Sequence, residues 1–245
     1  MSEQQPLPSY EDYRLNHHIR PSRTAEADRI FWTLNGPLQS SIWIISRGSL
    51  KPYAQGNDAS NPAWHPISQC SLTEPKISSI TVKVYGLDLW EGDWLYLHRL
   101  HMDEPDAFGA DDENYVVWGP LPDCNPELDE PPFSEENPVW LVKCCGKPRP
   151  RGKGFKVVVQ PSPGKEFVTI HDYVSTLHPR LLESRDDIID NLCMVYDKVR
   201  PAEVKLFVNF NGPKSLQFDL DYESQSARWI NDEKRRRPCP LVDDQ

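Results

Sequence analysis

This chain of 245 residues predicts an α+β fold with a mostly antiparallel sheet, and two kinds of pattern carry that prediction. Apolar and polar residues alternate over residues 80–84 and again over 204–220, which is the period of half-buried strands. Capping signals and helical spacing mark 169–178 and 184–199, and 222–232 is a third candidate, so two or three helices are expected in the C-terminal half. Aromatic residues make up 10% of the chain, enough apolar surface to require a core.

Length and local composition predict a single domain with extended ends. Residues 1–26 are polar and contain three prolines, so we expect a flexible N-terminal arm. A single α+β domain is expected over 27–232, because 245 residues suit one large core better than two. Residues 233–245 form a basic and then acidic C-terminal tail.

The first expected strands are 30–34 and 41–45, since both are rich in Ile and Trp and the turn signal Asn-Gly-Pro lies between them. Residues 50–75 are rich in Pro, Asn and Ser and are expected to be loop. The strand at 80–84 is expected to continue through a bulge at Gly86 toward Leu89, because the apolar phase shifts at the glycine. Residues 94–100 are expected to form a neighbouring strand.

The charge of the chain reverses in its middle. Between Arg99 and Lys143 there are twelve acidic residues and no Lys or Arg, and we expect an acidic surface excursion over 103–138. Residues 143–156 then carry six basic residues and no acidic one. Strand candidates at 139–142 and 155–159 flank these bases, so pairing of the two strands would place the bases on a hairpin tip.

The C-terminal half has the clearest signals for the ends of its helices and strands. Thr169 and Ser184 are each followed three residues later by Asp, as in a capping box, and the two helices are expected to stop at His178-Pro179 and before Pro201. A hairpin follows over 204–220, in which alternating apolar residues flank a turn expected at Asn211-Gly212.

Three separated pieces of the chain resemble a fungal domain family of unknown function. They are IFWTL at 30–34, LDLW at 87–90 and FVTIHDYV at 167–174. In that family a first strand bearing Trp, an apolar strand ending near Trp, and a VT-x-x-D-V-L helix start occur in this order. The resemblance implies a compact α+β domain of fungal origin and transfers no catalytic residue. The acidic excursion and the 204–220 hairpin depart from the family pattern.

No motif in the chain indicates an enzyme or a cofactor. The sequence lacks a G-x-S-x-G elbow and a Walker loop, and its six cysteines include no CxxC pair. His98 and His101 offer imidazole ligands, but on the expected strand residues three apart face opposite sides, so no metal site is expected there. Cys144 and Cys145 lie in an apolar run, where thiols usually serve packing.

The basic segment is the main candidate for partner binding, through Lys147, Arg149, Arg151, Lys153 and Lys156. Three uses remain open: docking to an acidic surface of another protein, internal pairing with the acidic excursion, and an idle solvated loop. The net charge of −10 disfavours nucleic acid as the partner, although an accessory nucleic-acid role remains a second alternative. The function expected first is therefore a non-enzymatic protein-interaction module.

The first alternative is an enzyme or small-molecule binder with an aromatic pocket, since the chain has eight Trp. The candidate lining residues are Trp32, Trp43, Trp90, Trp94, Trp118 and Trp140. A possible nuclear-import signal is formed by Lys234, Arg235, Arg236 and Arg237. No secretory signal or membrane span is expected, which predicts a cytoplasmic or nuclear protein with reduced cysteines, and the oligomeric state stays open.

Overall fold

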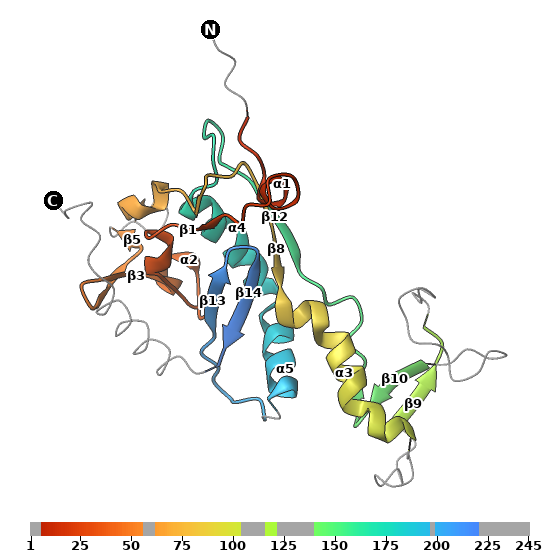
Figure 1. Cartoon of the computed structure of the whole chain (residues 1–245). Coiled ribbons are helices and arrows are strands. Elements are labelled where there is room, and N and C mark those ends of the chain that lie inside the picture. The colour runs from red at the N-terminus through yellow and green to blue at the C-terminus, as the bar shows by residue number, and fades with distance from the viewer. Residues whose placement is uncertain (1–5, 56–61, 104–115, 122–139, 197–198, 221–245) are drawn as a thin grey trace. The chain divides into compact units, whose positions relative to one another are not determined.

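The computed structural model describes residues 6–55, 62–103, 116–121, 140–196 and 199–220, without the side chains of 99–103, 210 and 211 (Figure 1). Helices and mostly antiparallel sheets occur together, and two helices lie in the C-terminal half, which confirms the predicted α+β class. The chain divides into two compact units, where the sequence predicted one domain over 27–232. Unit 1 comprises the residues through Gly86 and from Gly154 onward, and unit 2 comprises Leu87–Lys153.

The main sheet of unit 1 has the order β12 (Lys156–Val159), β8 (Ile80–Val84), β14 (Ser215–Asp219) and β13 (Phe207–Gly212). Its pairs are antiparallel except for β8 with β14. The predicted C-terminal hairpin is therefore confirmed, but its turn differs. Gly212 pairs with Ser215, so the chain reverses at Pro213-Lys214 and not at Asn211-Gly212.

A second sheet joins β2 (Ile30–Trp32), β3 (Ile42–Ser46) and β4 (Ser49–Pro52), all antiparallel, with the short helix α2 (Leu38–Ser41) before β3. The two strands predicted here are confirmed. A bridge between Thr33 and Phe207 connects this sheet to the main one. The predicted loop 50–75 instead contains short elements: β5 (Ala54–Gln55), β6 (Ala63–Trp64), the 3₁₀ helix η2 (Pro66–Gln69) and β7 (Thr73–Glu74).

Residues 6–26, which belong to the segment predicted as a flexible arm, pack within unit 1. Helix α1 (Tyr10–Asn16) begins at Ser9 with a complete capping box, and Tyr10 is buried. Strand β1 (Ser22–Arg23) pairs with β7, and the 3₁₀ helix η1 (Ala27–Arg29) follows. Burial of one aromatic ring and pairing with β7 hold a polar segment that local composition marked as loose.

Helices α4 (Ile170–Glu183) and α5 (Arg185–Val195) pack on β12 and β14, respectively (Figure 1). The predicted capping box of Thr169 forms. Helix α4 does not stop at His178-Pro179, because the residues beyond, including the fully buried Leu181, remain on its core-facing side and their burial outweighs the missing amide of the proline. Ser184 caps the end of α4 with its amide and makes no side-chain cap for α5, so the second predicted capping box is wrong.

His178 fixes α4 to the β2 strand inside the core. The indole Nε1 of Trp32 donates to His178 Nδ1 at 3.0 Å, and His178 Nε2 lies 2.8 Å from the carbonyl oxygen of Gly36. Because Nδ1 accepts, the proton of the neutral ring sits on Nε2 and is donated to Gly36. Burial lowers the pKa of His178, which favours this neutral form.

Unit 2 is an insertion in a hairpin of unit 1. β8 and β12 are antiparallel neighbours in which Lys83 pairs with Lys156, so the chain leaves and re-enters unit 1 at adjacent points. Such a site tolerates an inserted unit because the sheet on either side stays intact. The 4-stranded sheet therefore forms from segments that are separated by the whole of unit 2.

Unit 2 contains α3 (Tyr85–Asp103), except for its first two residues, which belong to unit 1. It also contains a sheet in the order β11 (Lys147–Pro148), β10 (Trp140–Cys144) and β9 (Val116–Gly119). The predicted strands at 86–89 and 94–100 are wrong. The buried residues Leu87, Trp90 and Trp94 follow a helical period, whereas Leu89 is exposed. β10 and β12 confirm the two predicted strands, but they lie in different sheets, so the basic segment is not a hairpin tip between them.

No helix among the described residues is long and apolar enough to cross a membrane. Most of the predicted acidic excursion, the helix predicted at 222–232 and the tail at 233–245 lie outside the described residues. The import signal predicted at Lys234, Arg235, Arg236 and Arg237 lies outside them as well.

Candidate functional site

The two arginines of the basic segment form ion pairs within unit 2. Arg149 Nε lies 2.5 Å from Glu91 Oε1, and Arg151 Nη1 lies 2.7 Å from the same oxygen. The side chain of Arg149 is only 4% exposed. Internal pairing was one of the three predicted uses, with the acidic excursion as the partner; the pairing seen here is with a carboxylate of α3, whose single negative charge offsets one of the two positive charges.

The backbone of the segment supports the same arrangement. The amide of Arg149 donates to Val142 O at 2.8 Å, which extends the pairing of β11 with β10 by one hydrogen bond. The guanidinium groups then reach Glu91 on α3. Arg149 therefore ties the helix to the sheet, so reversing its charge would test the fold of unit 2 and not partner binding alone.

The lysines of the segment are placed differently. Three of them are exposed: Lys147 in β11, Lys156 in β12, and Lys153 in the segment between these strands. Lys156 lies directly opposite Lys83 on β8, and Lys83 is also exposed. Like charges at directly opposed positions of a sheet lower its stability and raise the local positive potential.

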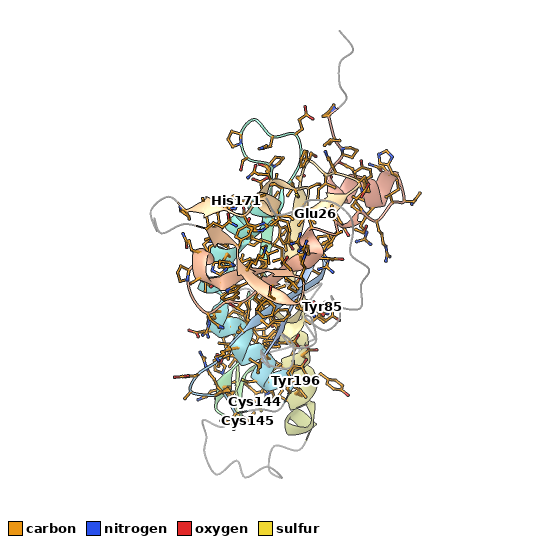
Figure 2. All side chains as sticks on the ribbon, turned by 90° about the vertical axis from the view of Figure 1, so that its left-hand side faces the viewer. Glu26, Tyr85, Cys144, Cys145, His171 and Tyr196 are labelled. Carbon is orange, nitrogen blue, oxygen red and sulfur yellow. The ribbon has the colours of Figure 1, made fainter. Side chains whose placement is uncertain are left out.

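A histidine and two cysteines come together in unit 2. Figure 2 labels the two cysteines, which are consecutive residues at the end of β10. Their Sγ atoms lie 3.8 Å apart, and His98 Nδ1 on α3 lies 3.6 Å from Cys145 Sγ. All three potential ligand atoms lie within 4.8 Å of one another. On the predicted strand, His98 and His101 would face opposite sides, and no metal site was expected there. His98 instead lies on a helix and meets the cysteines, whereas the side chain of His101 lies outside the described residues.

Cys144 is unsuited to act as a nucleophile. Its side chain is fully buried, and burial together with the neighbouring Cys145 raises the pKa of the Cys144 thiol to about 12. The group is therefore protonated at neutral pH, and the thiol form is unreactive. Only a cation in direct contact, such as a metal ion, stabilises the thiolate strongly enough to remove that proton.

The six tryptophans considered for a pocket are divided between the units. Trp32 and Trp43 belong to the second sheet of unit 1, and Trp32 is fully buried in the core. The other four belong to unit 2, where Trp90 and Trp94 are buried in α3 and Trp118 and Trp140 are half-buried in β9 and β10. A ligand pocket lined by them stays a prediction.

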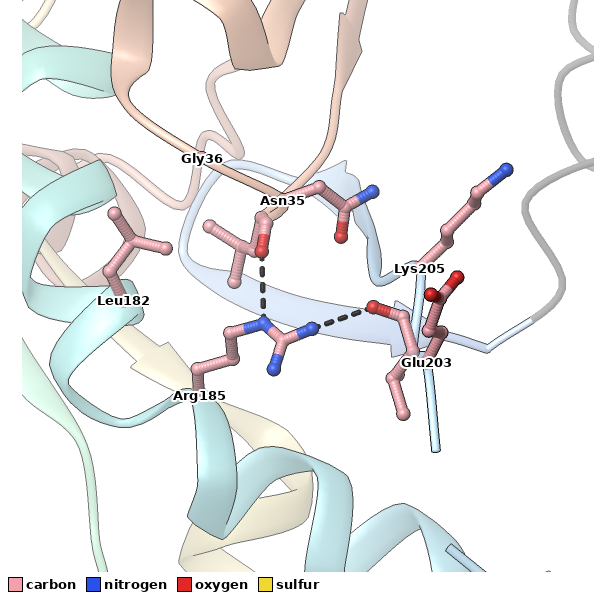
Figure 3. Close-up of a pocket in the computed structure, with 8 residues that line it drawn as sticks. Asn35, Gly36, Leu182, Arg185, Glu203 and Lys205 are labelled. Carbon is pink, nitrogen blue, oxygen red and sulfur yellow. Dashed lines mark hydrogen bonds between the residues drawn. The ribbon is translucent and has the colours of Figure 1, made fainter. Parts of the chain in front are cut away.

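Unit 1 contains a pocket of about 420 Å³ that no tryptophan lines (Figure 3). Arg185 crosses it, donating from Nε to Leu34 O at 3.0 Å and from Nη2 to Val204 O at 2.6 Å. Nearby, Asn35 Oδ1 accepts a hydrogen bond from the backbone amide of Leu206. These bonds hold the strand-connecting segments together, so the polar groups of the pocket serve the fold.

A second histidine, His171, lies at the start of α4 (Figure 2). Its ring forms a cluster with those of Trp64 and Tyr53, which also contact each other. The Tyr53 hydroxyl lies 3.1 Å from His171 Nδ1. Burial lowers the pKa of His171 and raises that of Tyr53, so both groups are neutral near pH 7. The described contacts account for this cluster as packing between α4 and the β5–β6 hairpin.

Sequence reasoning missed Glu91 as the partner of the arginines and the Cys-Cys pair as part of a cluster. The signal for both was present: Glu91, Trp94 and His98 are spaced by three and four residues, which places them on one face of a helix. Gly146 directly after the two cysteines is likewise a turn signal, and a turn at that point can bring neighbouring side chains together.

Comparisons with protein-family models, with curated proteins and with solved structures find no match to this chain. The resemblance to a fungal domain family therefore stays a prediction, and the function is argued from the residues of the two units alone.

Proposed function

We propose that this protein is a non-enzymatic protein-interaction module that uses exposed lysines to bind an acidic surface of another protein. The observation that carries the proposal is a difference between the arginines and the lysines of the basic segment. Arg149 and Arg151 are held by Glu91, whereas Lys147, Lys153 and Lys156 are exposed. The arginines hold the segment in place, and the lysines present positive charge to solvent.

The Lys83–Lys156 pair on the main sheet supports an acidic partner. Both lysines are exposed and occupy directly opposed positions of β8 and β12, so an acidic partner that docks there meets two positive charges. The overall charge of −10 makes such a local positive surface selective, because the rest of the chain repels other acidic molecules.

The cysteines that the structure describes carry free thiols, which suits the reducing interior of a cell. We therefore propose an intracellular location, in the cytoplasm or the nucleus. The predicted import signal at residues 234–237 favours the nucleus if it is functional.

The test replaces Lys147, Lys153 and Lys156 with Glu in the full chain. The variant and the wild type are immobilised at equal density, and captured cell-lysate proteins are quantified over a salt series. Proteins captured by the wild type should be lost by this variant, and their capture should fall as salt rises. The control carries Lys51→Glu, Lys165→Glu and Lys205→Glu, which make the same charge change at three lysines of unit 1 outside the basic segment, and should retain capture.

Equal capture by both charge-reversed variants would overturn the proposal. Loss of capture after nuclease treatment would also overturn it, in favour of the nucleic-acid alternative.

A further inference from the structure

The histidine–cysteine cluster of unit 2 depends on an unusual backbone turn. Consecutive residues in a strand point to opposite faces, so Cys144 and Cys145 would be separated if β10 simply continued. Instead Cys145 has φ 50° and Gly146 has φ 71°, and Cys144 pairs with Lys147 across this two-residue turn. A cysteine at the first of these left-handed positions is an exception, because Asn, Asp or Gly usually occupies it.

Backbone strain of this kind is concentrated at functional sites. Here its consequence is local and visible: the two sulfur atoms lie 3.8 Å apart with His98 Nδ1 3.6 Å from the second of them. The turn thus gathers two thiols from adjacent residues next to an imidazole from α3.

These distances match the edges of a tetrahedral zinc site. With Zn–S bonds of about 2.3 Å and a Zn–N bond of about 2.05 Å, tetrahedral angles place two sulfurs about 3.8 Å apart and a sulfur and a nitrogen about 3.6 Å apart. We infer that His98, Cys144 and Cys145 form a zinc-binding site. The third pair, His98 with Cys144, lies within 4.8 Å and closes by a small rotation of either side chain.

The ligand chemistry selects zinc over harder cations. Two thiolates and one imidazole are soft to borderline donors, whereas Ca²⁺ and Mg²⁺ require oxygen ligands. The described residues supply three ligands, which leaves one coordination position of a tetrahedral ion for water or a further group.

The surroundings also position the ligands. Trp94 is buried, and its ring centroid lies 4.6 Å from that of His98, so the imidazole is packed in place. Glu91 lies on the same face of α3 as His98 and pairs with Arg149 and Arg151. The same helix face is therefore joined to residues 144–151 twice, by the ion pairs and by the proposed metal.

A metal crosslink between helix and sheet would stabilise a unit as small as unit 2. The sheet of unit 2 has three short strands, and a unit of limited core volume needs an additional crosslink such as a structural metal. Zinc bound at His98, Cys144 and Cys145 would stabilise unit 2 by its binding free energy, because the unfolded chain does not hold the three ligands together.

The test uses the full chain, reduced and stripped of metal with a chelator, and then titrated with Zn²⁺ against a chromophoric competitor. We expect one zinc ion to bind per chain. In a parallel titration with Co²⁺, thiolate-to-metal charge-transfer absorption and intense tetrahedral d–d bands should appear together.

Cys145→Ser is the decisive variant, because Cys145 is half exposed in the turn and its loss leaves the buried Cys144 in place. It should weaken zinc binding by more than about 100-fold, since even residues that only support the ligands account for 10- to 100-fold. His98→Gln should do the same. The matched control Cys70→Ser changes a half-buried thiol of unit 1 and should leave binding unchanged.

Zinc binding that is absent in the wild type, or unchanged in Cys145→Ser, would overturn the inference. Formation of a Cys144–Cys145 disulfide without metal binding, seen as a mass decrease after mild oxidation, would instead assign the pair to redox chemistry. The inference does not rest on the proposed docking function: Lys156→Glu should leave zinc affinity unchanged even if it abolishes partner capture.

Discussion

The two units of this protein are stabilised by different kinds of interaction. Unit 1 has an extensive apolar core, in which Trp32, Phe31, Tyr173 and Leu177 are fully buried. Two of its buried polar groups are satisfied inside that core: the Trp32 indole donates to His178, and the Tyr173 hydroxyl donates to the carbonyl oxygen of Pro213. Unit 2 buries few apolar side chains among its described residues: Leu87, Trp90, Trp94, Leu141 and Cys144. Its helix and sheet are instead joined by the pairing of Glu91 with two arginines.

The difference follows from size. A larger unit removes more apolar surface from water for each residue that it orders, and a small one requires polar or metal crosslinks to reach the same stability. The charged groups of unit 2 that appear available for binding are therefore partly committed to its fold. Arg149 and Arg151 are the clearest case, because both contact Glu91.

The largest expected effect comes from the core of unit 1. Leu177→Ala removes a fully buried side chain from α4 and should lower the free energy of unfolding by about 2–5 kcal/mol. Urea unfolding followed by circular dichroism measures it. Leu97→Ala, at a side chain that is 48% exposed, is the control and should change stability by less than about 0.5 kcal/mol. Equal effects would show that the core described for unit 1 is not its main source of stability.

The corresponding change in unit 2 is Glu91→Gln. It removes the negative charge that Arg149 and Arg151 contact and should destabilise unit 2 by about 3 kcal/mol, the lower end for a broken buried ion pair because Glu91 is 28% exposed. Hydrogen exchange of the amides in α3 and β10 reads out this unit separately. Glu183→Gln breaks the exposed pair with Arg180 and should have an effect of at most about 1 kcal/mol. If the two variants exchange alike, the ion pairs do not stabilise unit 2.

Two glycines of α3 should respond in opposite directions. A Cβ at Gly86 would collide with the side-chain oxygen of Asn191 on α5, so Gly86→Ala should destabilise unit 1 by about 1–3 kcal/mol. A Cβ at Gly92 meets no atom within 4 Å, so Gly92→Ala should stabilise the helix by about 0.5–1 kcal/mol. Thermal unfolding of both variants measures the sign. A stabilised Gly86→Ala variant would show that α3 does not approach α5 this closely.

The last comparison concerns the pH dependence of unit 1. The pKa of His178 is lowered in the folded state. The contribution of this residue to the free energy of unfolding is therefore fully present above the unfolded pKa of about 6.5, and it is lost as the pH falls through the folded pKa. Stability should decrease by up to about 1.4 kcal/mol per pH unit in that interval. Melting temperatures between pH 8 and pH 5 measure the slope, which His178→Gln should reduce.

Asp172 affects a separate, more acidic range. Burial alone would raise its pKa, but hydrogen bonds from Ser162 and Thr169 outweigh burial and lower it. The contribution of Asp172 to the free energy of unfolding is therefore present above about pH 3.8 and is lost as the pH falls below that value.

For the His178 prediction, a wild-type slope between pH 8 and pH 5 that persists in His178→Gln would assign the acid sensitivity to another group.

The sequence predicted the parts of unit 1 whose signals are local. The strands at 30–32, 42–46, 80–84 and 156–159 and the capping box at Thr169 depend on alternation, on β-branched residues and on one hydrogen-bonded turn. The α3 region was misread because Leu87 and Leu89 also fit a period of two. Only burial distinguishes them, since Leu87 faces the interior and Leu89 does not.

The candidate sites depended on contacts that local patterns do not encode. The sequence by itself determined the α+β class, the hairpin at 207–219 and the concentration of bases at 143–156, because each follows from neighbouring residues. Tertiary structure alone decided that Glu91 binds Arg149 and Arg151 and that His98 meets Cys144 and Cys145. His98 lies 47 residues from Cys145, and Glu91 lies 58 and 60 residues from the two arginines. An ion pair or a ligand cluster forms wherever folding brings complementary groups within a few ångströms, regardless of their separation in sequence.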